Sequence, residues 1–312
     1  MPLSIFEVVF PVFALILMGF VAGRRQFVSV KGVGDLVTFV FYFAVPALVF
    51  RSSVQSLKLE NLQLSILLLY FGCNLVIFAA AIFLSKRAFK CSTEESSIFA
   101  TGAVFSNAVL IGFPVVQARY GSEGVVALTT ILSIHTLIFF TLPSVLIERA
   151  RSENANSWNT FKLAAKSVVK NPVIMAIAAG IVWSGLSLPV PYVADKMLVL
   201  LSQAATPCAL FAVGASVAQY KLKGELGSVW VMSAMKLLLA PAMVWTVGYH
   251  FTSLSPLWLA VATLTAAMPI GTNVFILSER YGIYGKAASS SILLSTFVSV
   301  FSLSLVLYLL PN

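Results

Sequence analysis

Charged residues are scarce in this chain, and their scarcity excludes a water-soluble protein. Only 10% of the 312 residues are Asp, Glu, Lys or Arg, whereas 59% are hydrophobic and the mean hydropathy is +0.97. Soluble domains carry about 25% charged residues, and a domain of this length could not bury so much apolar surface. The chain is therefore expected to be an integral membrane protein that lies in a lipid bilayer.

Cysteine, histidine and acidic residues are also rare where chemistry would need them. The three cysteines (Cys73, Cys91 and Cys208) form neither a disulfide framework nor a metal-binding spacing, so no metal and no other cofactor is expected. No cluster of His, Asp and Glu and no Ser-His-Asp set falls at membrane depth, which ranks a membrane-embedded enzyme last. Every acidic residue lies near the end of an apolar run or outside it, which argues against sodium coupling through carboxylates. Sodium binding by hydroxyl and carbonyl oxygens stays open.

The apolar residues fall into ten runs, each about long enough for a transmembrane helix. No small-residue cleavage site follows the first run, so it is expected to stay in the mature protein as a helix. The fold class expected is thus an all-α membrane protein with ten transmembrane helices. These predicted helices 1 to 10 cover residues 4–22, 34–50, 62–84, 96–118, 124–146, 170–187, 195–217, 228–250, 256–278 and 287–310.

The two halves of the chain repeat each other at one constant offset of 161 residues, without a gap. Residues 1–151 form the first five-helix unit and residues 162–312 the second, with the longest polar connection between them. Chance would align Leu with Leu, but it would seldom align prolines and glycines in one register. The matched positions are Pro11 with Pro172, Gly19 with Gly180, Pro46 with Pro207, Phe50 with Phe211, Gly121 with Gly282, and Gly124 with Gly285.

The distribution of Lys and Arg predicts the orientation, because these residues accumulate on the cytoplasmic side. Connections 1, 3, 5, 7 and 9 carry 15 of the 20 basic residues, whereas the even connections carry 4. Both termini are therefore expected outside, on the periplasmic side, and the net charge of +9 needs no nucleic-acid partner. Since five helices is an odd number, the second half enters the membrane from the opposite side, and the repeat is inverted. Inverted repeats are typical of secondary transporters, which alternate between two states of similar energy.

The fourth and ninth predicted helices each place a Pro, a Gly and an Asn in the middle of an apolar span. Proline frees backbone groups that are expensive in hydrocarbon unless an amide, a water or a substrate satisfies them. One such helix alone is more simply explained as a proline kink, but the same element in both halves favours two broken helices that cross. The half-helix N-termini would then attract an anion. The candidate substrate-binding residues here are Ser106, Asn107, Gly112, Pro114, Pro269, Gly271, Thr272 and Asn273.

Several of these motifs resemble the auxin efflux carrier family of bacterial and plant transporters, which includes malonate and malate carriers and the plant PIN proteins. The resemblance covers nearly the whole chain. It lies in Ser106-Asn107 through Pro114, Lys236-Leu-Leu-Leu-Ala-Pro241, Met268-Pro269 through Asn273, Tyr42-Phe-Ala-Val-Pro46-Ala, and the two Tyr-Gly pairs after the fourth and ninth helices. The chain lacks the long cytoplasmic loop of many plant members and so resembles a compact bacterial form in the cell inner membrane.

The resemblance implies a division of the helices that differs from the sequence repeat. Helices 1, 2, 6 and 7 would form a scaffold domain, and helices 3 to 5 and 8 to 10 a mobile transport domain that crosses at helices 4 and 9. It also implies elevator-type movement and homodimers through the scaffold helices. The function expected is secondary transport of small organic anions, namely carboxylates such as malonate, malate or auxin-like acids. An anion channel and a non-transporting membrane sensor on the same fold are the alternatives.

Two further residues are candidates for the transport chemistry. Lys236 lies about eight residues into the eighth helix, where a cation is costly and has no carboxylate partner in the sequence nearby. It either caps the C-terminal end of a broken half-helix or attracts the anionic substrate, and the two interpretations are compatible. His135 in the fifth helix is a candidate for proton coupling, although a lone His is more often a packing residue. The many hydroxyls of the tenth helix fit close packing at least as well as a polar path.

Overall fold

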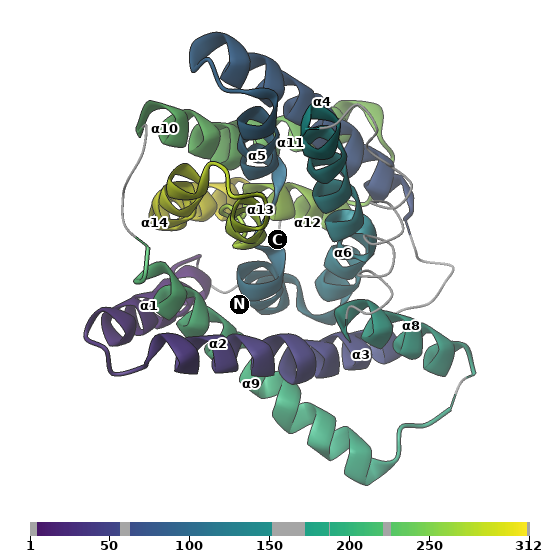
Figure 1. The fold of residues 1–312 in the computed structure, drawn as a ribbon. Helices are drawn as coiled ribbons and strands as arrows, with labels where there is room; N and C mark the ends of the chain where they lie inside the picture. The colour runs from purple at the N-terminus through teal and green to yellow at the C-terminus, as the bar shows by residue number, and fades with distance from the viewer. Residues whose placement is uncertain (1–4, 57–62, 152–171, 187, 221–225, 311–312) are drawn as a thin grey trace.

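All regular structure in the described part of the chain is helical. The computed structural model describes residues 5–56, 63–151, 172–186, 188–220 and 226–310, and within these ranges it contains no strand (Figure 1). The expected all-α membrane architecture is therefore confirmed at this level. Six helical stretches are long and apolar enough to cross a membrane: Val30–Val54, Ser65–Ala88, Ala108–Arg151, Tyr192–Val217, Leu226–Phe251 and Gly285–Leu309.

The predicted runs of the first half all fall on helices. The second run is a continuous helix in three parts, because a π-helical turn (η1) joins α2 to α3. The fourth run is interrupted after α5, and its second part (η3 and the start of α6) continues into the fifth. The bounds are α1 Ile5–Arg24, α2 Val30–Phe39, η1 Val40–Ala44, α3 Val45–Ser56, α4 Ser65–Ala88, α5 Thr93–Val104, η3 Ala108–Gly112 and α6 Phe113–Arg151.

The predicted runs of the second half behave similarly. The eighth run contains a π-helical turn (η4), and the ninth is interrupted between α12 and α13. The bounds are α8 Pro172–Gly185, α9 Tyr192–Val217, α10 Leu226–Ala234, η4 Met235–Leu239, α11 Ala240–Phe251, α12 Pro256–Ala267, α13 Asn273–Tyr281 and α14 Gly285–Leu309.

Local sequence explains where the two interrupted helices begin and where α6 bends. Ser92 and Glu95 form a capping box at the start of α5, in which the Glu95 N–H donates to Ser92 Oγ over 3.1 Å. Ser255 caps α12, and Pro256 occupies the first helical position, where its missing N–H is not needed. Within α6, Gly121 has φ 59° and ψ −153°, a conformation that glycine adopts without steric strain. The chain therefore changes direction there, between the predicted fourth and fifth helices.

Helices α1, α2, α3, α8 and α9 form one group, which lies in the lower part of Figure 1 with the other helices above it. Two matched glycines allow close packing within this group. A Cβ on Gly19 would meet the carbonyl oxygen of Phe211, and a Cβ on Gly180 would lie 3.2 Å from the carbonyl oxygen of Phe50. Because Gly19 corresponds to Gly180 and Phe50 to Phe211 in the repeat, the same contact is made twice with the halves exchanged.

The second group is built around its two interrupted helices. All residues of α12 from Trp258 to Ala267 are buried, and so are all residues of α5 from Ser96 to Val104. Helix α5 contacts α4, α6 and α10, while α12 contacts α11, α6 and α14. The two short helices thus run through the middle of this group, and their ends are placed deep inside the protein.

Candidate functional site

The two helix interruptions lie against each other and satisfy each other's backbone. Ser106 and Ile270 form an isolated antiparallel bridge. The Asn107 N–H donates to the carbonyl oxygen of Pro269 over 2.8 Å, and the Gly271 N–H donates to the carbonyl oxygen of Phe105 over 2.9 Å. Backbone groups that a broken helix leaves open are costly in an apolar interior, and here they pair across the crossing.

Two hydroxyl groups brace this crossing from neighbouring helices. Ser106 Oγ donates to the carbonyl oxygen of Thr265 over 2.7 Å and lies 3.2 Å from the Tyr70 hydroxyl. In the second interruption, between α12 and α13, the Ile270 N–H donates to Ser295 Oγ over 3.1 Å. The roles of Tyr70 on α4 and Ser295 on α14 were not predicted from the sequence, because nothing in an apolar helix distinguishes a hydroxyl that contacts the crossing from one that bonds within its own helix.

A pocket with a volume of about 270 Å³ lies beside the crossing, between both interruptions, α6 and the α2–η1 helix. Six of the residues expected at the site line it, namely Ser106, Asn107, His135, Gly271, Thr272 and Asn273. Thr136 adds a hydroxyl, and the remaining walls are Val37, Phe41, Phe105, Ala108, Val109, Leu110, Leu132 and Ile276. The structure therefore brings residues from both halves of the chain to one cavity.

Two helix N-termini border this pocket. The first residues of η3, Ala108 to Leu110, line it, and so does Asn273, the first residue of α13. The first N–H groups of a helix have no partner within that helix, and the helix dipole adds partial positive charge at the same end. No Asp, Glu, Lys or Arg is among the residues that line the pocket. The two helix N-termini therefore add partial positive charge at the pocket, which also borders the C-terminal end of α5 at Phe105.

His135 contributes a buried polar atom at the edge of the pocket. Its side chain is only 1% exposed and is surrounded by aromatic rings, with Phe105 at 4.7 Å, Phe139 at 5.2 Å and Tyr70 at 5.9 Å between ring centroids. Within the described residues, Nε2 of His135 has no hydrogen-bond partner. A buried nitrogen of this kind is costly unless something satisfies it, and the pocket is the space beside it.

Lys236 lies behind the crossing rather than in the pocket. It belongs to η4, is completely buried, and its Nζ donates to the carbonyl oxygen of Ala266 in the last turn of α12. The C-terminal end of a helix carries partial negative charge, which a fixed cation balances. Its direct contact is therefore with the end of the broken helix, the first of the two interpretations drawn from the sequence.

Pro269, Pro114 and Gly112 shape the crossing without lining the pocket, whereas Gly271 does both. The carbonyl oxygen of Pro269 accepts the hydrogen bond from the Asn107 N–H, and Pro114 is buried as the second residue of α6. Gly112 closes η3, where a Cβ would lie 3.3 Å from the Cβ of Ala108. Gly271 makes the closest approach, because a Cβ there would lie 2.8 Å from a ring carbon of Phe105 and 3.1 Å from the Ser106 carbonyl oxygen.

Comparison with known proteins fits this arrangement. A family model described as "Membrane transport protein" matches residues 4–307. The chain belongs to this family. It is the auxin efflux carrier family that the sequence motifs resemble, so that expectation is confirmed. Members of the family are membrane transporters rather than enzymes, which agrees with the absence of a catalytic set in the sequence.

Relatives from bacteria and plants extend the family match. The chain is 26% identical over 304 residues to a "Putative malonate transporter" of Rhizobium meliloti (strain 1021), covering 97% of this chain and 95% of that protein. It is 25% identical over 308 residues to the "Uncharacterized transporter YfdV" of Escherichia coli (strain K12), covering 96% and 95%. It is also 25% identical over 244 residues to "Auxin efflux carrier component 8" of Arabidopsis thaliana, covering 64% and 66%. The two bacterial relatives, both named as transporters, thus match nearly the whole chain, and the plant efflux carrier component matches about two thirds of it.

Proposed function

We propose that this protein is a secondary transporter of small organic anions and that it holds them in the pocket at the crossing. The observation that carries the proposal is that two half-helix N-termini, one from each half of the chain, border the same cavity without a charged side chain. An anion placed there would be stabilised by both helix ends. The name of the Rhizobium relative, which refers to malonate, agrees with a carboxylate substrate.

The size of the pocket suits a small organic acid. A volume of about 270 Å³ corresponds to roughly nine water molecules at about 30 Å³ each. A short carboxylate such as malonate or malate fits within such a space, together with water, with its polar groups near the helix ends. An auxin-like aromatic acid also fits within this volume and would contact the apolar rings of Phe41 and Phe105.

The polar residues of the pocket have separable roles in this proposal. The amides of Asn107 and Asn273 and the hydroxyl of Thr272 contact the substrate, because their side chains border the cavity. Ser106, Pro269 and Gly271 hold the crossing, while Gly112 and Pro114 shape the start of the second half-helix. Lys236 fixes the end of α12 and adds positive potential to the site from behind.

The proposed mechanism is elevator-type alternating access within ten helices arranged as two inverted repeats. Helices α1, α2–α3, α8 and α9 would be the scaffold, and α4 to α6 with α10 to α14 the transport domain. The exchanged glycine contacts of Gly19 and Gly180 support two-fold related halves. Val37 and Phe41 of the proposed scaffold wall a pocket whose other residues belong to the transport domain. Movement of one group past the other would therefore change which side of the membrane the pocket faces.

The remaining expectations complete the proposal. Both termini would lie on the periplasmic side of the cell inner membrane. A homodimer would form through the scaffold, where exposed apolar residues such as Met175 on α8 and Met197 and Leu200 on α9 are available. His135 would carry a proton during the transport cycle, since it lines the pocket and its Nε2 has no hydrogen-bond partner among the described residues.

Ligand-induced thermal stabilisation of the purified protein tests the site. A panel of carboxylic acids with and without sodium should include one that raises the unfolding midpoint, because a ligand that binds the folded state stabilises it. Asn107→Leu and Asn273→Leu should each reduce that shift, with about 1 to 3 kcal/mol lost from binding. Gln203→Leu on the exposed face of α9 is the amide control and should leave the shift intact. If both crossing variants respond like the control, the site lies elsewhere.

Counterflow in proteoliposomes separates the carrier from its rivals. Unlabelled substrate inside the vesicles should accelerate uptake of labelled substrate, and the flux should saturate. A channel would show neither property, and a sensor would show binding without flux. If His135 carries a proton, an imposed pH gradient should drive uptake by the unaltered protein, and His135→Gln should lose this drive while keeping counterflow.

A further inference from the structure

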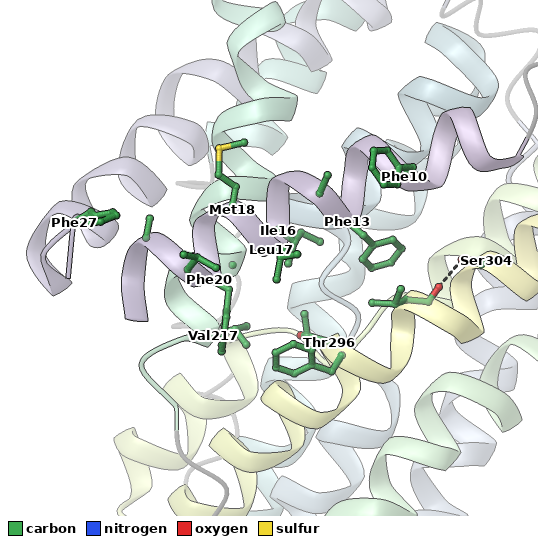
Figure 2. A pocket seen from close by; sticks show the side chains of 16 residues that line it. Phe10, Phe13, Ile16, Leu17, Met18, Phe20, Phe27, Val217, Thr296 and Ser304 are labelled. Carbon is green, nitrogen blue, oxygen red and sulfur yellow. Dashed lines mark hydrogen bonds between the residues drawn. The ribbon is translucent and has the colours of Figure 1, made fainter. Parts of the chain in front are cut away.

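A second and larger cavity, of about 980 Å³, opens between α1 and α14 near the end of α9. Figure 2 shows the 16 side chains that line it, with Phe13 pointing from α1 toward α14. Several of these residues are exposed at the protein surface, including Leu17 at 58% and Phe27 at 80%. The cavity is therefore a groove that is open to the surroundings of the helices, and we call it the α1–α14 groove.

The α1–α14 groove offers no polar group to a ligand. Among the described residues that line it, none is charged, and the side-chain hydroxyls are those of Thr296 and Ser304. Both are already used, because Thr296 Oγ1 donates to the carbonyl oxygen of Ile292 over 2.7 Å and Ser304 Oγ donates to that of Val300. A carboxylate would lose its hydration here without replacement, so the groove is not a path for the proposed substrate. A hydrocarbon chain meets no such penalty.

A basic pair lies at one end of the groove. Helix α1 ends at Arg24, Arg25 follows it, and Phe27 lines the groove just beyond them. Both arginines are exposed, and the ion pairs found among the described residues involve neither of them. Among the described residues, Arg24 Nη1 donates to the carbonyl oxygen of Ala218 over 3.5 Å. The distribution of basic residues puts this end on the cytoplasmic side, where anionic lipids concentrate.

We propose that the α1–α14 groove binds one anionic phospholipid, with an acyl chain along α1 and the phosphate at Arg24 and Arg25. From Phe10 to Ala22 the groove follows α1 for about 18 Å at 1.5 Å per residue. Half of a hydrocarbon core is about 15 Å thick, so a chain from the cytoplasmic leaflet fits within this length. The apolar walls recognise the chain, and the two guanidinium groups recognise the phosphate.

This lipid would sit at the boundary between the two groups of helices. Helix α1 is fixed to α9 by the close approach of Gly19 to Phe211, whereas it meets α14 through the edge-to-face contact of Phe20 with Phe297, at 5.3 Å between centroids. A chain in the groove extends that contact along α14. The lipid site does not depend on the identity of the transported substrate and can be tested separately from it.

Thermal unfolding in detergent tests the site, with phosphatidylglycerol and phosphatidylcholine of identical acyl chains as probes. Phosphatidylglycerol should raise the midpoint more, and native mass spectrometry should detect one tightly bound copy per chain. Arg24→Gln with Arg25→Gln should weaken its binding by about fivefold for each arginine. Arg87→Gln with Lys90→Gln, a basic pair in another connection on the same expected side, is the matched control and should bind normally.

A second pair of variants tests the chain-binding part. Ala14→Phe puts a ring into the groove and should abolish the extra stabilisation by phosphatidylglycerol, whereas Ala178→Phe on the exposed face of α8 should preserve it. Equal stabilisation by both lipids would overturn the proposal. So would an Ala14→Phe variant that is folded and still binds phosphatidylglycerol as tightly as the unaltered protein.

Discussion

Replacement of Gly271 by Ala perturbs the crossing at its closest point. The added Cβ would lie 2.8 Å from a ring carbon of Phe105 and 3.1 Å from the Ser106 carbonyl oxygen, both shorter than an ordinary van der Waals contact. Gly271 does not have a positive φ, so the substitution acts through space rather than through backbone strain. The Phe105 ring cannot yield freely, because it packs edge-to-face on His135 at 4.7 Å.

The expected magnitude follows from the crowding. Insertion of a methyl group into a close-packed interior costs about 1 to 3 kcal/mol, which lowers the unfolding midpoint by about 2 to 5 °C for a chain of this length. The Phe105 ring and Gly271 both border the pocket, so substrate binding should weaken together with stability. Differential scanning fluorimetry with and without substrate measures both effects on the same sample.

Gly72→Ala is the matched control for this substitution. Gly72 lies in the interior of α4, is exposed, and has no atom within 4 Å of a Cβ built on it. Alanine is favoured over glycine in a helix by about 1 kcal/mol, so the control should be slightly more stable than the unaltered protein. If Gly271→Ala is as stable as Gly72→Ala and binds substrate normally, the two interruptions do not cross as the structure has them.

Three further predictions concern the charge, the brace and the topology. Lys236→Met should nearly abolish transport at normal protein levels, whereas Lys236→Arg should keep part of it, as measured by uptake into proteoliposomes; full activity of the Met variant would show that the cation is dispensable. Ser106→Ala removes the donor to the Thr265 carbonyl and should cost about 1 to 3 kcal/mol of stability in thermal unfolding, and a variant as stable as the parent would argue against the brace. Single cysteines at Ser122 and Tyr284 should react with an impermeant reagent from opposite sides of the membrane, and labelling from the same side would refute the inverted repeat.

The helical runs and the two interruptions were predictable from the sequence because they depend on local properties. Long apolar runs specify membrane helices, and a Pro and a Gly near an Asn specify a break. In the ninth predicted run the break contains Pro269 and Gly271 and precedes Asn273. In the fourth run the break lies at Asn107, whereas Gly112 and Pro114 fall in the helical turns that follow it. Close packing of Gly19 and Gly180 also agrees with their matching positions in the repeat, although the sequence did not name their partners.

The lining of the pocket was less predictable, because it depends on which residues of the two helix interruptions lie opposite each other. At the repeat offset of 161 residues, Asn107 corresponds to Met268 and Asn273 to Gly112. The structure nevertheless pairs Ser106 with Ile270 and brings both asparagines to one cavity. The positions that meet in space are therefore not the positions that correspond in the repeat, and a single sequence does not reveal which residues meet. The contacts of Tyr70 and Ser295 with the crossing could not be predicted for the same reason.

The hydrogen bonds that join the two interruptions run between main-chain atoms, from Asn107 to Pro269 and from Gly271 to Phe105. No side-chain substitution can delete those donors and acceptors, apart from the introduction of another proline. The main-chain hydrogen bonds that hold the crossing together are therefore independent of the side chains that would select the substrate. Libraries randomised at Asn107, Thr272, Asn273 and Thr136 should yield folded carriers with altered substrate preference, and this makes the pocket a practical starting point for redesigned anion transporters.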